Sequence, residues 1–138
     1  MAAGERSFLF CSHIKFVMIV TGIISTLQVA HLEKDITFYI ELGFKLDWKW
    51  PEKDPTHASI SASDHSFMLA VVDKSLHIEK ADLHFRVEDV ENLYKELSIK
   101  KISMGALTQT DYGMLDFSVT SLNGHHLVFG QPSGDWQE

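Results

Sequence analysis

The sequence predicts an α+β fold in which two βαβββ modules form a curved, mixed-sheet cup with helices on its outer face. In each half of the chain, an alternating apolar stretch typical of a half-buried strand precedes apolar residues at the spacing of an amphipathic helix. Further alternating stretches follow each helix. Superposing Val29 on Val87 also brings Leu32 onto Val90, an offset of about sixty residues that is too long for a solenoid repeat. Duplication of one module is the simplest interpretation.

The first module is expected to run strand, helix, strand, strand, strand. Its helical stripe is followed by Gly43, a residue suited to a left-handed helix cap. Trp48 and Trp50 then alternate with charged residues until Pro51, which cannot donate to a β-ladder. The predicted elements are a strand at 23–29, a helix at 31–42 and strands at 44–50, 57–62 and 66–72.

The second module repeats this order. Asp89 stands near the start of its helix, where a carboxylate can accept hydrogen bonds from free backbone amides. Asn123-Gly124 predicts a type I′ hairpin turn, which needs positive φ at both central residues. The predicted elements are a strand at 82–87, a helix at 90–97 and strands at 102–108, 114–120 and 126–130.

Length and composition predict one compact domain in a reducing compartment. The chain has 138 residues, 45% of them hydrophobic, which is enough for a core without disulfides or structural metals. Its lone cysteine, Cys11, cannot form an internal bridge, so the cytoplasm is the expected location. We expect one domain at residues 18–131, with modules at about 18–75 and 80–131, between an N-terminal appendage at 1–17 and a C-terminal tail at 132–138.

The charge and hydropathy of the chain exclude two classes of partner. A net charge of -7 repels phosphate backbones and disfavours nucleic acid, whereas a cationic or neutral small molecule is compatible with it. Ser12, His13 and Lys15 interrupt the apolar N-terminal stretch well short of the ~20 residues that a membrane span requires. No membrane association and no cleavable signal peptide are therefore expected.

Several motifs resemble the vicinal oxygen chelate superfamily, which includes glyoxalases, bleomycin-resistance proteins and extradiol dioxygenases. The first half carries LQVAHLE at 27–33, FY at 38–39 and LGF at 42–44. The second half carries FRVEDV at 85–90, YG at 112–113 and NGHHLVF at 123–129. The chain departs from the family at His31, where Asp is usual, and at SLNG (121–124), where Asp-Pro-Asp-Gly is usual. The resemblance implies the two-module cup fold.

The resemblance also locates four positions that hold a metal in family members with metal chemistry. These positions are occupied here by Ile24, Ala70, Asp82 and Val128. Catalytic divalent sites need about three ligands from His, Asp or Glu, and only Asp82 can coordinate. We therefore expect no metal and no other cofactor. Among eight histidines, only His84 and His126 fall on the predicted cup face, so a non-standard site built from them is the open alternative.

Strand alternation predicts which side chains face the cup. Trp48 and Trp50 supply ring faces that attract flat or cationic ligands, with core or interface packing as the alternative role. Arg86 is expected to orient a carboxylate or enolate ligand, or else to be neutralised by Asp82 and Asp116. An apolar cleft with a few convergent polar groups is typical of a small-molecule site. The predicted ligand-binding residues are Gln28, Trp48, Trp50, Met68, Asp82, His84, Arg86, Asp116 and His126.

The expected function is metal-independent binding of a small molecule, such as an antibiotic or metabolite, by a homodimer. Metal-free bleomycin-resistance-like members are acidic dimers that sequester cationic drugs at the subunit interface, and the resemblance implies the same here. No nucleophile is evident, because Cys11 lies outside the matched motifs. Whether the protein is an enzyme stays open: a lyase, isomerase or dioxygenase using His84 or His126 as general base, or a non-standard metal site, is the alternative.

Overall fold

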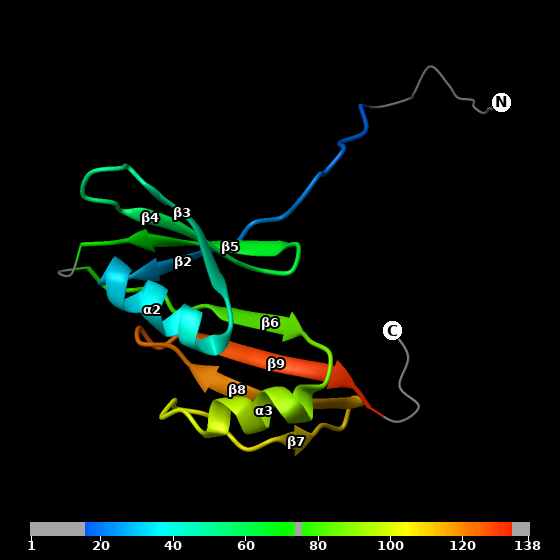
Figure 1. The fold of residues 1–138 in the computed structure, drawn as a ribbon. Helices are drawn as coiled ribbons and strands as arrows, with labels where there is room; N and C mark the ends of the chain where they lie inside the picture. The colour runs from blue at the N-terminus through cyan, green and yellow to red at the C-terminus, as the bar shows by residue number, and fades with distance from the viewer. Residues whose placement is uncertain (1–15, 74–75, 134–138) are drawn as a thin grey trace, which may run out of the picture.

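The chain folds into two mixed four-stranded sheets with one helix on each, in a computed structural model that describes residues 16–73 and 76–133 (Figure 1). The first module contains β2 (Thr26–Val29), α2 (Leu32–Leu42), β3 (Lys45–Trp50), β4 (His57–Ala62) and β5 (His65–Val71). The second contains β6 (Asp82–Arg86), α3 (Val90–Ser98), β7 (Thr108–Gln109), β8 (Met114–Thr120) and β9 (His126–Pro132). The predicted order βαβββ, twice repeated, is confirmed.

The two sheets share one topology. Their strand orders are β2-β5-β4-β3 and β6-β9-β8-β7. In each sheet the first strand pairs in parallel with the last strand of the module, and the remaining pairs are antiparallel. Gln28 stands opposite Ala70 in the first module, and Arg86 stands opposite Gly130 in the second. The first strand of each module is therefore a sheet edge that faces the other module.

The helices cover one face of each sheet and create the core. Gly43 ends α2 with φ 112°, a conformation that glycine adopts without strain. Asp89 begins α3 by accepting from the backbone N–H of Asn92. The rings of Phe44, Phe67 and Phe85 lie with centroids 5.3–5.9 Å apart and join the modules. Buried apolar residues on the helix side of both sheets make one continuous core.

A β-bulge in β3 decides which side chains face away from α2. Lys45 stands opposite Ser61 and Leu46 opposite Ile60, but Trp48 stands opposite Ser59, so Asp47 is an extra residue. The alternation therefore shifts by one position at Asp47. Leu46 lies on the helix side, whereas Trp48 and Trp50 lie on the opposite face, which we call the concave face. Lys49 returns to the helix side, where its ammonium lies 3.1 Å from Glu33.

Two predicted strands are shorter than expected. The strand predicted at 23–29 begins only at Thr26, and Ile23 is 89% exposed. Apolar alternation indicates which face a side chain would take, but not whether a neighbouring strand is present to pair. The strand predicted at 102–108 is reduced to β7 and one isolated bridge between Met104 and Val119. Gly105 approaches Ser118 there, and a Cβ on it would lie 2.9 Å from the Ser118 hydroxyl.

The predicted type I′ turn at Asn123-Gly124 is wrong. Only Gly124 of the two has positive φ, and its N–H donates to the carbonyl of Ser121 at 3.0 Å. Leu122 and Asn123 are therefore the central residues of the turn. The Asn123 side chain makes long-range hydrogen bonds, described below. These bonds, and not its local turn preference, determine its backbone conformation.

Other sequence predictions extend beyond the described residues. Residues 1–15 of the predicted appendage and residues 134–138 of the predicted tail lie outside the described ranges. Within those ranges, none of the helices has the length and apolar character needed to cross a membrane.

Candidate functional site

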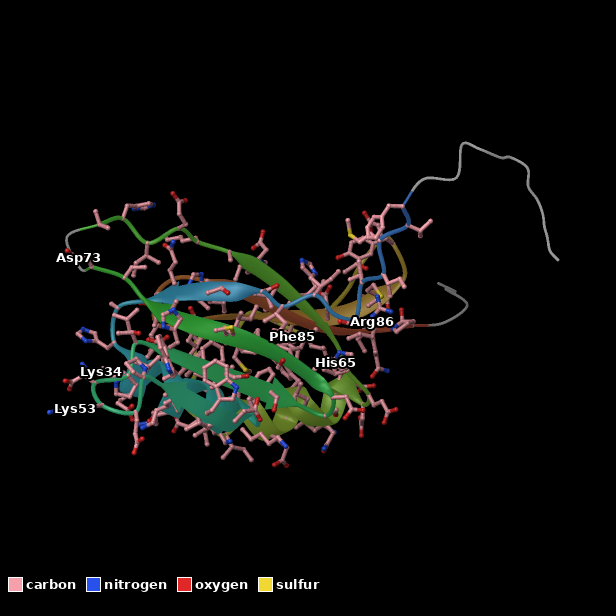
Figure 2. All side chains as sticks on the ribbon, turned by 90° about the horizontal axis from the view of Figure 1, so that it is seen from above. Lys34, Lys53, His65, Asp73, Phe85 and Arg86 are labelled. Carbon is pink, nitrogen blue, oxygen red and sulfur yellow. The ribbon has the colours of Figure 1, made fainter. Side chains whose placement is uncertain are left out.

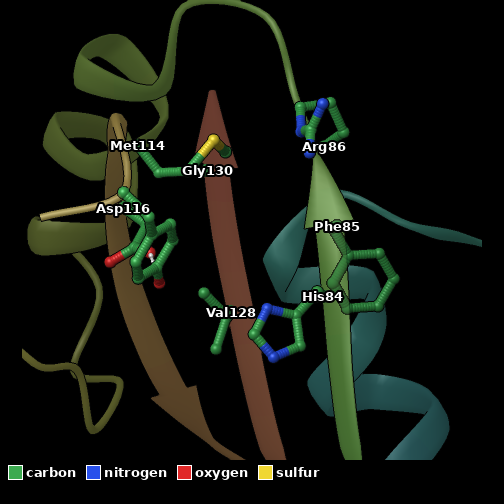
Figure 3. A pocket seen from close by; sticks show the side chains of 8 residues that line it. His84, Phe85, Arg86, Met114, Asp116, Val128 and Gly130 are labelled. Atoms are coloured by element: carbon green, nitrogen blue, oxygen red, sulfur yellow. Dashed lines mark hydrogen bonds between the residues drawn. The ribbon is translucent and has the colours of Figure 1, made fainter. Parts of the chain in front are cut away.

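The concave face of the second module holds a pocket of about 260 Å³ (Figure 3). His84 and Arg86 project into it from β6, Met114 and Asp116 come from β8, and Val128 comes from β9. Side chains of residues that stand opposite each other on paired strands project from the same face of the sheet, and His84 stands opposite Val128. The remaining lining residues are Phe85, Tyr112 and Gly130.

The pocket combines a cation, a carboxylate and a phenol. The Tyr112 hydroxyl donates to Asp116 Oδ2 at 3.4 Å, a long contact that leaves the carboxylate open to another donor. Val128 is buried and forms an apolar floor. Gly130 presents no side chain, and a Cβ there would lie 2.9 Å from the Asp116 Cβ. Such a site can bind a small polar or aromatic molecule through Arg86 and Asp116.

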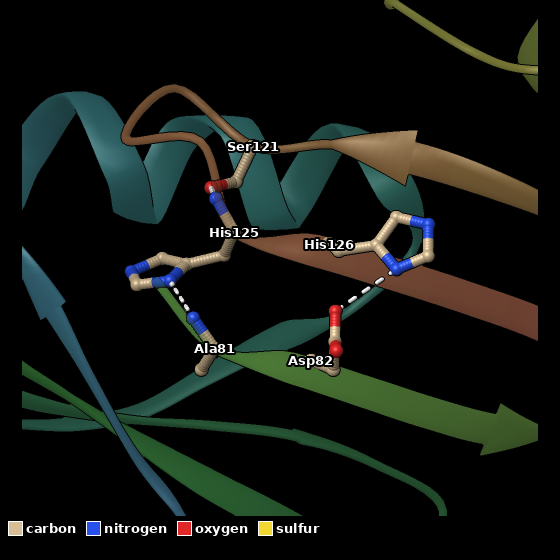
Figure 4. A network of polar contacts seen from close by, with 5 residues as sticks. All are labelled: Ala81, Asp82, Ser121, His125 and His126. Carbon is tan, nitrogen blue, oxygen red and sulfur yellow. Dashed lines mark hydrogen bonds and ion pairs between the residues drawn. The ribbon is translucent and has the colours of Figure 1, made fainter. Parts of the chain in front are cut away.

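An Asp-His pair lies on the same concave face. Asp82 stands opposite His126, and Asp82 Oδ1 lies 3.0 Å from His126 Nδ1 (Figure 4). A carboxylate that holds Nδ1 fixes the tautomer in which Nε2 is the proton acceptor. Both side chains are more than half exposed, so the attraction between them is strongly screened by solvent.

The metal positions implied by the resemblance do not converge on a ligand set. Ile24 precedes β2, and Ala70 and Val128 have no donor side chain. Asp82 is already paired with His126. Among the described residues, no group of three or more His, Cys, Asp and Glu side chains is placed to hold a metal ion. The donor set of this face does not fit the metal centre that the family uses.

The concave face of the first module carries the tryptophans. Trp48 is 44% and Trp50 62% exposed, and the Trp50 ring lies 5.9 Å from that of His57. Met68 stands opposite Ser59 on this face. The Gln28 side chain, in contrast, accepts from the backbone N–H of Glu79 at 2.8 Å. This surface is open and aromatic.

The nine predicted site residues therefore divide between two sheets. Gln28, Trp48, Trp50 and Met68 belong to the first, and none of them lines the pocket of the second module. His84, Arg86 and Asp116 meet in that pocket, with Asp82 and His126 beside it on the same face. Sequence reasoning missed Tyr112, Met114 and Gly130 as lining residues. The Tyr-Gly motif at 112–113 was a usable signal for the first of them.

A buried polar network closes the seam between β2 and the second module. His125, fully buried, accepts from the Ala81 N–H through Nδ1 at 3.0 Å (Figure 4). Its Nε2 donates to the Gln28 carbonyl at 2.7 Å. Asn123 accepts from the Ala30 N–H at 3.1 Å and donates to Asp35 at 2.7 Å. The loop of the second module therefore fixes the edge of β2 and the start of α2.

Two ionisable groups in this seam are perturbed. Burial raises the pKa of Asp35, partly offset by the hydrogen bond from Asn123 and by the nearby His125 and His31. Burial and the Asp35 carboxyl raise the pKa of Tyr39 well above its ordinary range. The Tyr39 hydroxyl has no partner of standard hydrogen-bond geometry among the described residues, although Ser121 lies near enough to lower that pKa in part. Both side chains therefore keep their protons, and stay neutral, to a higher pH than exposed Asp and Tyr side chains do.

Comparison with solved structures identifies the same architecture in other proteins. A bleomycin-binding protein complexed with bleomycin is 14% identical, with a TM-score of 0.67 over 83% of this chain and 100% of that chain. TnmS3, an antibiotic-binding protein from Streptomyces sp. CB03234, is 20% identical, with a TM-score of 0.67 over 84% and 100%. A glyoxalase-related enzyme from Clostridium phytofermentans is 16% identical, with a TM-score of 0.71 over 83% and 97%. At these identities the likeness shows the fold alone.

The sequence itself gives the family. No curated protein matches the chain. A family model described as Glyoxalase/Bleomycin resistance protein/Dioxygenase superfamily matches residues 14–129, which is most of the sequence. With the two-module fold and the second-module pocket already described, the chain belongs to the glyoxalase/bleomycin resistance protein/dioxygenase superfamily.

Proposed function

We propose that the protein binds a small aromatic or cationic molecule on its concave faces, without a metal, and returns it unchanged. One observation carries this proposal: the face opposite the helices presents exposed Trp48 and Trp50 on one sheet and the Arg86–Asp116 pocket on the other. Charged and aromatic side chains on such a face are costly unless solvent or a ligand meets them. Solved relatives whose names record bleomycin or antibiotic binding support this choice.

We further propose that the protein forms a homodimer and works in a reducing cytoplasm. Each module leaves one concave face uncovered, so a single chain offers two half-open surfaces instead of one enclosed site. Two copies related by a two-fold axis can place the tryptophan surface of one against the pocket of the other. An enclosed site of this kind would bury more of a drug-sized ligand than either face alone.

The proposed ligand chemistry follows from the charge and the rings. A net charge of -7 attracts cations, and tryptophan faces bind them through the ring quadrupole. Arg86 is the exception, because a guanidinium at the pocket pairs best with a carboxylate or enolate oxygen. A ligand with a flat cationic ring system and one acidic oxygen would use both surfaces.

Thermal-shift screening tests the proposal with bleomycin, other cationic antibiotics, 2-oxo acids and thiol conjugates as probes. A probe at a hundredfold excess over its Kd stabilises the folded state by about 2.7 kcal/mol. We expect a hit to quench tryptophan fluorescence and to bind at least tenfold more weakly to Trp48→Ala and Arg86→Ala. Lys34→Ala on α2 removes a charge away from both concave faces and should leave affinity unchanged. Equal affinities in all variants would place the ligand elsewhere.

A second function, metal-free lyase or isomerase activity, is favoured by the Asp82–His126 pair. Its 3.0 Å contact would orient His126 as a general base. An enzyme converts the probe, and His126→Gln would abolish conversion while binding persists; a sequestering protein returns every probe chemically unchanged. A dioxygenase would require metal, so elemental analysis of chelator-free, untagged protein decides that branch. A stoichiometric metal lost in His84→Ala would overturn the metal-free proposal.

A further inference from the structure

The loop between β8 and β9 contains the only Asn-Gly sequence of the chain, Asn123-Gly124. An asparagine amide is chemically labile in this setting, because glycine has no Cβ to keep its backbone nitrogen away from the preceding side chain. That nitrogen attacks the asparagine Cγ, the bond between Cγ and Nδ2 breaks, and ammonia leaves with the proton of the nitrogen. Water then opens the succinimide ring to aspartate or isoaspartate. The net reaction consumes one water and releases one ammonia, so it needs no enzyme and no oxidant.

The fold keeps these reacting groups apart. The Gly124 N–H donates to the Ser121 carbonyl at 3.0 Å, so the attacking nitrogen is engaged within the loop. The Asn123 amide is held at both ends by the first module: Oδ1 accepts from the Ala30 N–H at 3.1 Å, and Nδ2 donates to Asp35 Oδ1 at 2.7 Å. Before the Asn123 Cγ meets the Gly124 nitrogen, these hydrogen bonds must break and the seam must open.

The reaction products cannot rebuild the seam. An aspartate at position 123 replaces the Nδ2 donor by a carboxylate oxygen that faces Asp35, which is only 1% exposed. Two carboxyls at hydrogen-bond distance do not both ionise, so one must stay protonated at a cost that grows with pH. An isoaspartate also lengthens the main chain by one carbon. This displaces His125, whose ring bonds to Ala81 and Gln28 close the seam.

The surroundings of Asp35 do not relieve this repulsion. His31 and His125 attract the charge of its carboxylate, and Tyr39 lies close to it. Burial outweighs these attractions and raises the pKa of the Asp35 carboxyl even while Asn123 donates to it. A second carboxyl in place of the Asn123 amide would remove that donor as well.

We propose that Asn123 is a modification site at which spontaneous deamidation permanently unlocks the two modules. The closed loop does not react, so the rate equals the fraction of molecules with an open seam multiplied by the rate in the open loop. The site therefore records how often the seam has opened during the lifetime of the molecule. It is separate from the concave-face pocket, because Lys34, next to Asp35, lies at the opposite end of the molecule from Arg86 (Figure 2).

Mass spectrometry of full-length protein kept in mildly alkaline buffer tests the site. We expect the amide of Asn123 to be converted to a carboxyl at least tenfold more slowly than in a synthetic peptide of residues 119–127. Asn92, which is followed by Leu93, is the internal reference and should keep its amide. Equal rates in protein and peptide, or an intact amide in the peptide, overturn the proposal.

A variant and a denaturant test whether the seam controls the rate. Asp35→Ala removes one anchor of the amide and should speed deamidation at least tenfold, whereas Asp111→Ala, at an exposed carboxyl, should leave it unchanged. Urea below the unfolding transition tests the same control in the unmodified protein, because it increases the open fraction and should raise the rate. Equal rates in the two variants, or a rate that urea does not change, contradict control by the seam.

Exchanging the two side chains tests what the product does. Asn123→Asp reproduces the aspartate product and should lower the urea midpoint, more at pH 8 than at pH 5. The reason is that the proton shared by the two carboxyls in the folded state is lost as the pH rises. Adding Asp35→Asn restores an amide donor opposite the new carboxylate and should recover most of the midpoint at pH 8. An Asn123→Asp protein as stable as the parent at pH 8, or a double variant without recovery, would show that deamidation does not unlock the modules.

Discussion

The amide of Asn123 donates to the Asp35 carboxylate at 2.7 Å, across 88 residues of sequence and between the two modules. The same side chain accepts from the N–H of Ala30, next to the helix N-cap His31, whose own side chain makes no cap. Asn123 therefore ties the residue that precedes the N-cap of α2 to a side chain on the helix itself. Four predictions follow from this seam and from the neighbouring sheet, each with a matched control.

Asn123→Ala should lower the free energy of unfolding by about 2–4 kcal/mol, because it leaves the Ala30 N–H and the buried Asp35 carboxyl without partners. Urea denaturation followed by circular dichroism measures this. Asn92→Ala is the control: Asn92 is exposed on α3 and only its backbone takes part in the cap, so the change should stay within about 0.5 kcal/mol. Similar losses in both variants would show that the Asn123 hydrogen bonds contribute nothing.

Asp35→Asn should remove the loss in unfolding free energy that Asp35 causes as the pH rises. Because the folded-state pKa of Asp35 is raised, the folded state binds its proton more tightly than the unfolded state. The stability contribution of this group is therefore present below the unfolded pKa and is lost as pH rises through the folded pKa. Asparagine keeps an oxygen that accepts from Asn123 but does not titrate. The unfolding free energy of the variant, measured relative to that of the parent protein, should therefore increase from pH 4 to pH 7. Asp111→Asn, at an exposed position, should show no such trend.

The adjacent histidines should differ in their effect on stability. His125→Ala strands the Ala81 N–H and the Gln28 carbonyl and opens a cavity, at a cost of about 3 kcal/mol in unfolding free energy. His126→Ala removes only a solvent-screened pair with Asp82, at about 0–1 kcal/mol. Thermal unfolding of both variants at pH 7 makes the comparison. A loss from His126→Ala as large as that from His125→Ala would contradict the seam described here.

Gly130→Ala should destabilise the second sheet by about 1–3 kcal/mol. The added Cβ would lie 2.9 Å from the Asp116 Cβ and 3.4 Å from the Leu115 carbonyl, so β8 and β9 would have to move apart. Gly22→Ala meets no atom within 4 Å and should be neutral within about 0.5 kcal/mol. Denaturant midpoints report the difference, and an unchanged midpoint for Gly130→Ala would show that the strands have room to spare.

The fold was readable from the sequence because its signals are local and repeated. Periodicity placed both helices, with Gly43 as the end of α2 and Asp89 as the cap of α3. The concave face was predictable in the second module, where Asp82, His84 and Arg86 alternate without interruption. Strand ends were less predictable, because pairing depends on whether a neighbouring strand is present, which residues 23–25 do not reveal by themselves.

The seam could not be predicted, because its partners are distant in sequence. Asn123 has a strong local turn preference, and nothing near it indicates a bond to Asp35. Strand alternation separated His125 from His126 and put only His126 on the cup face, but nothing in the sequence indicated that His125 bonds to Ala81 and Gln28. The division of the predicted site between two sheets likewise depends on how the modules sit together, which periodicity within each module does not specify.

The extra residue in β3 has a consequence for how this surface can change by mutation. Upstream of Asp47 the alternation places Leu46 against the helix, and downstream it places Trp48 and Trp50 on the other side. Deleting Asp47 would remove the bulge but leave Trp48 opposite Ser59 and Trp50 opposite His57, so both indoles would stay on the concave face. The aromatic character of the concave face thus depends on the bulge that accommodates Asp47: a one-residue insertion or deletion on the other side of the bulge, between Asp47 and Trp48 or within β4, would change which face the indoles take without replacing either tryptophan.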